Sequence, residues 1–189
     1  MRFFALIMIV LLGSCSGNSR APSNQNDACA ILEQRRGWLG DMQRAEQTWG
    51  VPVHVQMATI WKESSFRARA KTARTYFLGS IPTGRRSTAY GYPQALDGTW
   101  DWYREQTGKR RAQRDDYADA VDFIGWYMDR SERKLGLAKN DAYSQYLAYH
   151  EGHSGYANGS YRGKSWLTGV ASEVQAMANR YENQLQYCT

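Results

Sequence analysis

Apolar side chains recur along most of this chain at the three- and four-residue spacing of an amphipathic helix, and no segment keeps the alternation of a β-strand for long. The clearest stripe, within residues 164–187 and followed by Cys188, consists of Leu167, Val170, Val174, Met177, Tyr181 and Leu185. Because the helical period runs through most of the chain, we expect a mainly α fold, with one folded domain over residues 28–189.

Capping residues and helix breakers divide the rest of this domain. The other expected helices are 28–49 capped by Asp27, 53–64 begun by Pro52, 97–105, one from Asp115 or Asp116 to Gly136, and 141–150 capped by Asn140. Residues 71–98 and 152–163 are rich in Gly or Pro and long enough to be binding loops. We expect the functional site between these two loops.

One carboxylate stands out in the helix predicted over residues 53–64. Glu63 lies at the border of the apolar stripe of this helix rather than on its solvated face. A half-desolvated carboxyl has a raised pKa, which a group needs if it is to donate a proton near neutral pH. The alternative is a surface Glu at a helix end. Glu63 is therefore the first candidate for a general acid.

The N-terminus has the pattern of an export signal. An apolar run too short to span a bilayer leads to Leu12-Gly13-Ser14-Cys15, which resembles a bacterial lipobox, in which the cysteine receives a lipid after cleavage. We expect a signal peptide over residues 1–14, and a lipidated Cys15 followed by a flexible polar tether, together residues 15–27. The alternative is an ordinary secretory signal without a lipid.

The number of cysteines agrees with lipidation. Three cysteines in an exported chain leave one odd thiol, and lipidation of Cys15 leaves Cys29 and Cys188 as a pair. We therefore predict a Cys29–Cys188 disulfide that closes almost the whole domain into one loop. The net charge of +6 suits an anionic polymer such as the cell wall, whereas an exported address argues against nucleic acid.

Three motifs follow one another along the chain: Glu63-Ser64-Ser65-Phe66 with Ala70-Lys71-Thr72 behind it, Ala89-Tyr90-Gly91-Tyr92-Pro93-Gln94, and Ala148-Tyr149-His150-Glu151-Gly152. In this order they resemble the SLT-type lytic transglycosylase family, which has Glu-Ser-x-Phe on a helix, then Ala-x-Gly-Leu-Met-Gln, then Ala-Tyr-Asn. The resemblance covers about residues 50–155. It implies a lysozyme-like helical domain with a cleft, loops and room for a minor β-hairpin.

The chain departs from the family pattern in several places. Residues 73–87 are extra, and we expect them to shape the cleft. Tyr92-Pro93 replaces Leu-Met, and His150 replaces Asn, which changes the hydrogen-bonding repertoire at that position. The serine that the family has near its acid falls at Thr72.

The resemblance also implies a mechanism. Glu63 would protonate the bond between N-acetylmuramic acid and N-acetylglucosamine, and the acetamido group of the substrate would supply the function of a second carboxylate. The same Glu63 would then activate the 6-hydroxyl of the sugar, which gives a 1,6-anhydro product without water. We expect no cofactor, and no metal, because His150 and His153 are three residues apart rather than the four of a zinc helix.

The substrate-binding positions that the resemblance implies are Ser64, Thr72, Tyr92, Gln94, Tyr149 and His150. Tyr149 is expected to hydrogen-bond near Glu63 or the acetamido group. Structural roles remain open for three of these residues: a core phenol for Tyr149, a loop cap for Gln94 and a turn hydroxyl for Thr72.

Two other functions remain open. A hydrolytic muramidase on the same scaffold would need a second carboxylate to hold water, and Glu151 or Asp97 could serve. A non-catalytic wall-binding lipoprotein would keep the cleft without turnover. In each case we expect a monomer at the periplasmic face of the outer membrane, held by its lipid only. Its partner would be peptidoglycan strands, and it would act alone or within an envelope or secretion assembly.

Overall fold

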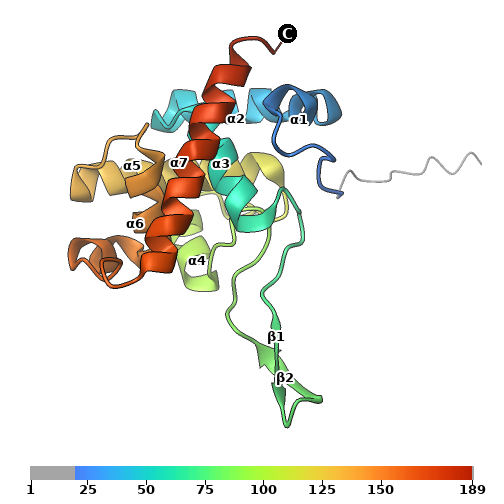
Figure 1. The fold of residues 1–189 in the computed structure, drawn as a ribbon, viewed down its shortest axis with the longest axis vertical. Helices are drawn as coiled ribbons and strands as arrows, with labels where there is room; N and C mark the ends of the chain where they lie inside the picture. Colours follow the sequence, from blue (N-terminus) through green and yellow to red (C-terminus); the bar gives the residue numbers. More distant parts are fainter. Residues whose placement is uncertain (1–19, 189) are drawn as a thin grey trace, which may run out of the picture.

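The computed structural model describes residues 20–188, which form a helical body with one projecting hairpin (Figure 1). The helices are α1 (Ala28–Gln34), α2 (Trp38–Trp49), α3 (Val53–Ser64), α4 (Asp97–Thr107), α5 (Tyr117–Leu135), α6 (Ala142–Ala157) and α7 (Ser165–Leu185), and the antiparallel strands are β1 (Arg74–Phe77) and β2 (Ile81–Arg85). The mainly α fold with a minor hairpin that the sequence predicts is confirmed.

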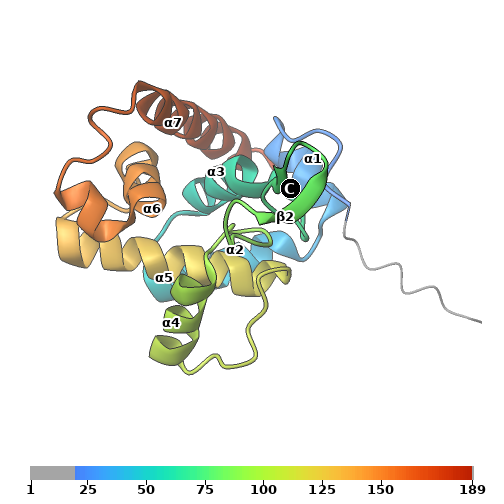
Figure 2. The ribbon, with the colours of Figure 1, turned by 90° about the horizontal axis from the view of Figure 1, so that it is seen from below.

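Helix α5 lies at the centre of the fold, where α2, α3, α4 and α6 pack around it (Figure 2). Helices α3 and α6 also pack on α7. Asp116 caps the first turn of α5 by accepting a hydrogen bond from the backbone N–H of Asp119, and Gly136 ends the helix with left-handed backbone. Local capping chemistry thus sets both ends of the central helix, as the sequence predicts.

The single helix predicted over residues 28–49 is wrong in its middle, because the chain breaks between α1 and α2. Arg35 has non-helical dihedral angles (φ −134°, ψ 63°), and Gly37 precedes the first residue of α2. The two pieces have different partners: α1 packs on α7, whereas α2 packs on α5 and α3. The break falls next to a glycine, where a helix is weakest, and lets the two apolar faces point at two different neighbours.

Helix α6 also differs from the prediction. Asp141, and not Asn140, caps it with its carboxylate. The helix continues beyond His150 through a kink at Gly152, whose φ of 75° and ψ of 159° suit a residue without a Cβ. Much of the loop expected over 152–163 is therefore helical. Helices α3, α4 and α7 match the predicted helices within two residues at each end.

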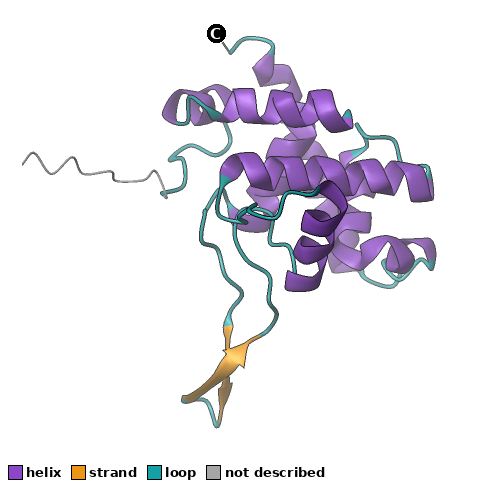
Figure 3. Ribbon diagram, turned by 180° about the vertical axis from the view of Figure 1, so that it is seen from behind, coloured by secondary structure: helices purple, strands orange, loops and turns teal. Residues whose placement is uncertain are grey.

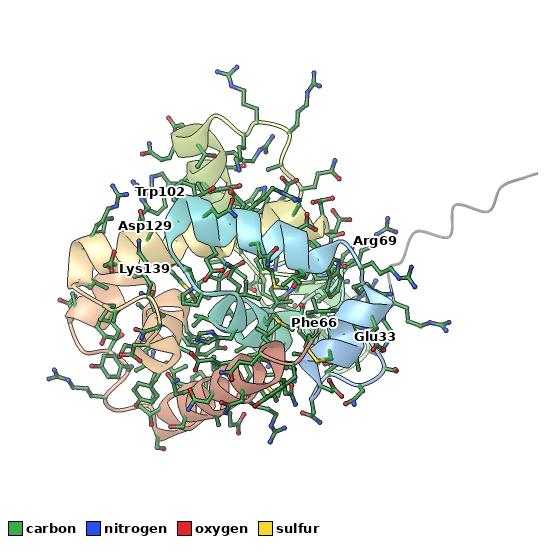
Figure 4. All side chains as sticks on the ribbon, turned by 90° about the horizontal axis from the view of Figure 1, so that it is seen from above. Glu33, Phe66, Arg69, Trp102, Asp129 and Lys139 are labelled. Carbon is green, nitrogen blue, oxygen red and sulfur yellow. A yellow bond between two sulfur atoms is a disulfide. The ribbon has the colours of Figure 1, made fainter. Side chains whose placement is uncertain are left out.

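The two ends of the domain are fastened together. Cys29 on α1 and Cys188 just after α7 form the predicted disulfide (Figure 4). Residues 20–27 lie against the domain as well, since Pro22 is buried and the hydroxyl of Tyr181 donates to the backbone carbonyl of Gln25.

Residues 20–27, which the sequence assigned to a flexible tether, therefore lie on the domain, because they have hydrogen-bond partners on α1 and α7. The predicted signal peptide and the lipidated Cys15 lie outside the described residues. Within residues 20–188, no helix is long and apolar enough to cross a membrane.

The hairpin formed by β1 and β2 stands away from the helices at the end of two extended arms (Figures 1 and 3). Its strands pair from Arg74 opposite Arg85 to Phe77 opposite Ile81, with an irregularity between Thr75 and Tyr76. A two-stranded hairpin without a supporting layer is only marginally stable. The fold therefore contains one element that the common core does not support.

Candidate active site

A cleft of about 430 Å³ lies where the C-terminal end of α3 meets α5, α6 and the chain before α4. It is lined by two carboxylates together with other polar, aromatic and small residues, namely Glu63, Thr72, Ala89, Gln94, Ala95, Leu96, Thr99, Phe123, Tyr127, Tyr149, His150, Glu151 and Gly152. The structure thus brings together five of the residues that the sequence proposes for the site: Glu63, Thr72, Gln94, Tyr149 and His150.

Glu63 lies in the last turn of α3, and a buried aromatic residue fixes the end of that helix. The chain leaves α3 with left-handed backbone at both Ser65 (φ 50°) and Phe66 (φ 56°), which residues other than glycine rarely adopt. Phe66 lies among the helices (Figure 4), is 0% exposed and stacks on Trp38 with 5.8 Å between ring centroids. Core packing therefore offsets the backbone strain and holds the carboxyl-bearing turn in place.

Burial makes the Glu63 carboxyl a weaker acid than an ordinary glutamate. The group is half-buried, and desolvation raises its pKa to about 7. Two neighbours act in the opposite direction, since the Tyr146 hydroxyl hydrogen-bonds the carboxylate and the Lys62 ammonium attracts it. Because desolvation is the larger effect, Glu63 keeps its proton close to neutral pH, as a general acid must.

The phenol that reaches Glu63 is Tyr146 rather than Tyr149. Tyr149 lines the cleft, but its hydroxyl donates to the backbone carbonyl of Pro93 at 2.5 Å. Its ring packs edge-on against Tyr127 at 5.2 Å between centroids, which directs the hydroxyl towards the loop. Tyr146 lies one turn earlier on the same face of α6, and it is buried. The three-residue spacing of the two tyrosines was the signal in the sequence that could have identified it.

Gln94 and Thr72 hold the loop wall of the cleft. The side-chain amide nitrogen of Gln94 donates to the carbonyls of Ala70 at 3.0 Å and Gly91 at 2.8 Å. The Thr72 hydroxyl donates to the carbonyl of Ser87 at 3.0 Å. These bonds are the structural roles that the sequence left open, and both residues also line the cleft.

Glu151 is the second carboxylate of the cleft, and its oxygens are already engaged. Lys164 Nζ lies 2.8 Å from both of them, His150 Nδ1 lies 3.1 Å from one, and the Ser160 hydroxyl donates to the other. Lys164 and Ser160 hold the pKa of Glu151 down at about 2. His150 in turn packs edge-on against the exposed ring of Trp166, with 5.3 Å between centroids.

Ser64 and Tyr92 do not line the cleft, contrary to the prediction from sequence. Ser64 is buried, and its hydroxyl donates to the carbonyl of Ile60 at 3.1 Å because α3 is still helical at that point. Tyr92 is buried and packs edge-on against Trp38 and Tyr117. Both residues support the end of α3 from inside the core.

Two further residues that the sequence considered have other partners. Asp97 lies outside the cleft lining and pairs with Arg114 at 2.7 Å. His153 stacks on Tyr127 at 4.5 Å between centroids and its Nε2 lies 3.1 Å from the Ser131 hydroxyl. Among residues 20–188, no group of His, Cys, Asp and Glu side chains is arranged to hold a metal ion.

The expectation that residues 73–87 shape the cleft is wrong for the part of the chain that the structure describes. Thr72 and Ala89, which flank this segment, line the cleft, but no described side chain from within it does. The reason is geometric, because the two arms carry the paired strands away from the helices (Figure 3). The segment begins and ends at the cleft wall without covering it.

Comparison with known proteins gives one family. The family model described as Transglycosylase SLT domain matches residues 3–188. A search of curated proteins finds no match. The matched range contains every cleft-lining residue.

Proposed function

The chain belongs to the transglycosylase SLT domain family, and on this premise we propose that it is a peptidoglycan lytic transglycosylase with Glu63 as its single acid and base. Family membership gives an action on peptidoglycan of the lytic transglycosylase type, on a mainly helical, lysozyme-like fold. The bond that we propose for cleavage is the β-1,4 bond from N-acetylmuramic acid to N-acetylglucosamine.

In the first step, the Glu63 carboxyl donates its proton to the glycosidic oxygen, and the bond from that oxygen to C1 of the muramic acid breaks. The acetamido oxygen of the same sugar attacks C1, so a second carboxylate is unnecessary. The raised pKa of Glu63 supports this step, because the proton is available near neutral pH. The Tyr146 hydroxyl then stabilises the carboxylate that forms.

In the second step, the Glu63 carboxylate accepts the proton of the sugar's own 6-hydroxyl. The O6 atom attacks C1 and displaces the acetamido oxygen, which closes a 1,6-anhydro ring and returns Glu63 to its acid form. No water is consumed. The half-buried position of Glu63 supports ring closure, because water is the competing nucleophile.

We assign the sugar contacts to the cleft-lining residues Thr72, Gln94, Tyr149 and His150. The exposed Trp166 ring beside His150 offers a face on which a sugar can stack. These four contacts replace the larger set from sequence, since Ser64 and Tyr92 are buried in the core.

A hydrolytic muramidase is disfavoured by the state of the second carboxylate. Such an enzyme needs a carboxylate free to hold a water molecule opposite Glu63. Glu151 accepts hydrogen bonds from Lys164 at both oxygens, and its lowered pKa makes it a poor base. A non-catalytic wall-binding protein is disfavoured as well, because binding alone does not need a carboxyl with a pKa of about 7.

The observation that carries the proposal is this half-buried Glu63 carboxyl in the cleft. The test is mass spectrometry of the fragments released from purified peptidoglycan by the wild type and by Glu63→Gln. We expect 1,6-anhydro fragments from the wild type, and release that is slower by a factor of about 10² to 10⁴ from Glu63→Gln. Fragments heavier by one water would establish hydrolysis, and equal release by the two proteins would remove Glu63 from the mechanism.

We further propose that the protein is exported, carries a lipid on Cys15 and acts as a monomer at the periplasmic face of the outer membrane. The Cys29–Cys188 disulfide supports an oxidising compartment. Metabolic labelling with a fatty acid should modify the wild type and leave Cys15→Ser unlabelled. Equal labelling of both proteins would contradict the anchor.

A further inference from the structure

The β1–β2 hairpin ends in a tip of exposed apolar side chains, Tyr76, Leu78 and Ile81. Their exposed fractions are 54%, 82% and 55%, and no helix of the described chain covers them. Leu78 also has left-handed backbone (φ 50°), so the turn presents a large apolar side chain to solvent in a strained conformation. Folding gains nothing from this arrangement, which points to a partner for the tip.

The neck of the hairpin, formed by Arg74, Arg85 and Arg86, is basic and lacks an acidic partner. The whole segment 71–87 contains these arginines and Lys71 but no Asp or Glu. Arg74 lies directly opposite Arg85 in the strand pair, where like charges repel. None of the ion pairs found among residues 20–188 includes the neck. An anion bound at the neck would relieve this repulsion.

We propose that the hairpin docks on an anionic phospholipid bilayer, with its tip inserted at the boundary of the acyl chains and its neck on the lipid phosphates. The order of the groups along the hairpin matches the layers of a membrane surface, since the apolar groups are distal and the cations proximal. From Ile81 to Arg85 the strand spans about 13 Å, and interfacial elements insert by about 5–10 Å. The arginines then lie at the level of the headgroups.

Other anionic partners fit the hairpin less well. Peptidoglycan offers negative charge but no apolar layer for Leu78 and Ile81. An acidic protein would need a pocket that matches a tip on which three separate side chains point into solvent. A bilayer accepts such a tip without shape complementarity, and a tyrosine beside aliphatic side chains suits its interface.

Docking would fix the position of the cleft relative to the membrane. Both arms of the hairpin begin at residues that line the cleft, Thr72 and Ala89. Bonds across the arms connect them, because Arg85 donates to the carbonyl of Thr72 at 2.6 Å and Arg86 N–H donates to that of Ala73 at 3.2 Å. This contact is separate from the lipid proposed on Cys15 and does not depend on the proposed function.

The test is flotation with lipid vesicles, using the protein from Arg20 to Thr189, which contains every element of the fold and both disulfide cysteines. We expect the wild type to float with vesicles of phosphatidylcholine and phosphatidylglycerol, and not with phosphatidylcholine alone. The double variant Leu78→Ser, Ile81→Ser should bind at least about tenfold more weakly. The variant Arg85→Gln, Arg86→Gln should lose about fivefold per arginine, and its remaining binding should depend less on salt.

Matched controls remove equivalent groups elsewhere. Tyr187→Ser removes a side chain that is 79% exposed next to the C-terminus, at the opposite end of the molecule from the hairpin (Figure 1). Arg36→Gln with Arg180→Gln removes two exposed cations from the helical body. Both controls should float like the wild type, and all variants should unfold at the wild-type temperature.

Three results would overturn the proposal. The first is a wild-type protein that remains at the bottom of the gradient, unbound, when anionic vesicles are present. The second is equal flotation of the wild type and the Leu78→Ser, Ile81→Ser variant. The third is hairpin-dependent binding to isolated peptidoglycan or to an acidic protein with no binding to vesicles, which would assign the hairpin to another class of partner.

Discussion

Phe66 and Leu78 have the same backbone conformation, but one side chain is buried and the other is exposed. Both are large apolar residues with left-handed backbone, at φ 56° and 50°. Phe66 is 0% exposed and stacks on Trp38, whereas Leu78 is 82% exposed on the hairpin, which stands away from the helices in Figure 3. A left-handed conformation costs a residue other than glycine about 1–3 kcal/mol, and only the burial of Phe66 offsets that cost within the chain.

The difference shows how this chain uses strain. At the end of α3, packing of Phe66 fixes the turn that carries Glu63, so the strained backbone belongs to the geometry of the cleft. At the hairpin, the same conformation places an apolar side chain in solvent, and its compensation must come from outside the chain. The contrast separates a region that the fold determines from one that a partner determines.

The largest expected effect is the loss of the buried ring. Phe66→Ala should lower the free energy of unfolding by about 4 kcal/mol, because a cavity forms beside Trp38. It should also slow fragment release, since the turn after Glu63 loses its anchor. Denaturant unfolding measures the first effect. A loss below about 1 kcal/mol would mean that the core does not hold the end of α3.

The disulfide tests whether the stability of the core and the geometry of the cleft can be separated. Cys29→Ser with Cys188→Ser should cost about 3 kcal/mol, which is typical for the loss of a disulfide, because the bond joins positions 159 residues apart and so restricts the unfolded chain. Fragment release at low temperature should remain close to that of the wild type, because neither cysteine lines the cleft. Calorimetry measures the loss of stability, and a release assay measures activity. A loss of activity alongside the loss of stability would show that the termini affect the site.

The burial of Glu63 makes the free energy of unfolding depend on pH. Its pKa is raised to about 7 in the folded protein, so the folded state holds the proton more tightly than the unfolded chain does. The wild type should therefore lose stability as the pH rises from about 4.5 through 7, and Glu63→Gln should not. At pH 8 we expect Glu63→Gln to be more stable by about 3 kcal/mol. Unfolding curves that stay parallel across this range would contradict the burial of the carboxyl.

The smallest effect is expected at Leu78, the exposed residue that was compared with Phe66. Leu78→Gly relieves the strain of a left-handed position, and the larger backbone entropy of glycine in the unfolded chain offsets most of that gain, so the free energy of unfolding should change by no more than about 1 kcal/mol. Denaturant unfolding alongside Phe66→Ala makes the contrast direct. A destabilisation as large as that of Phe66→Ala would show that the hairpin tip supports the fold.

Local chemistry explains which parts of the fold could be predicted from the sequence. Asp116 and Gly136 act within a few residues of themselves, so the ends of α5 were predictable from capping rules. The break at Arg35 was not, because it depends on α1 and α2 packing against different helices. The hairpin was expected only as a minor possibility, since its strands form outside the core that the apolar periodicity describes.

The same limit applies to the site. The position of Glu63 at the border of an apolar stripe indicated its partial burial, because burial follows from helical periodicity, but it left a surface Glu at a helix end open, and the motif order made Glu63 the candidate acid. The hydrogen bond from Tyr146, and the burial of Ser64 and Tyr92, depend on how α6 and the loop before α4 fold over the end of α3. Motif position places a residue near the site but does not determine which way its side chain points.

The most direct test of the account is the pH dependence of kcat/KM for fragment release, measured for the wild type, Tyr146→Phe and the control Tyr149→Phe. We predict that the wild-type value falls above about pH 7, as Glu63 loses the proton that it must donate. Tyr146→Phe should move this limb to higher pH, because the lost hydrogen bond stabilises the carboxylate, while Tyr149→Phe should leave its position unchanged. A limb that lies near pH 4.5 in the wild type would contradict a buried general acid at Glu63.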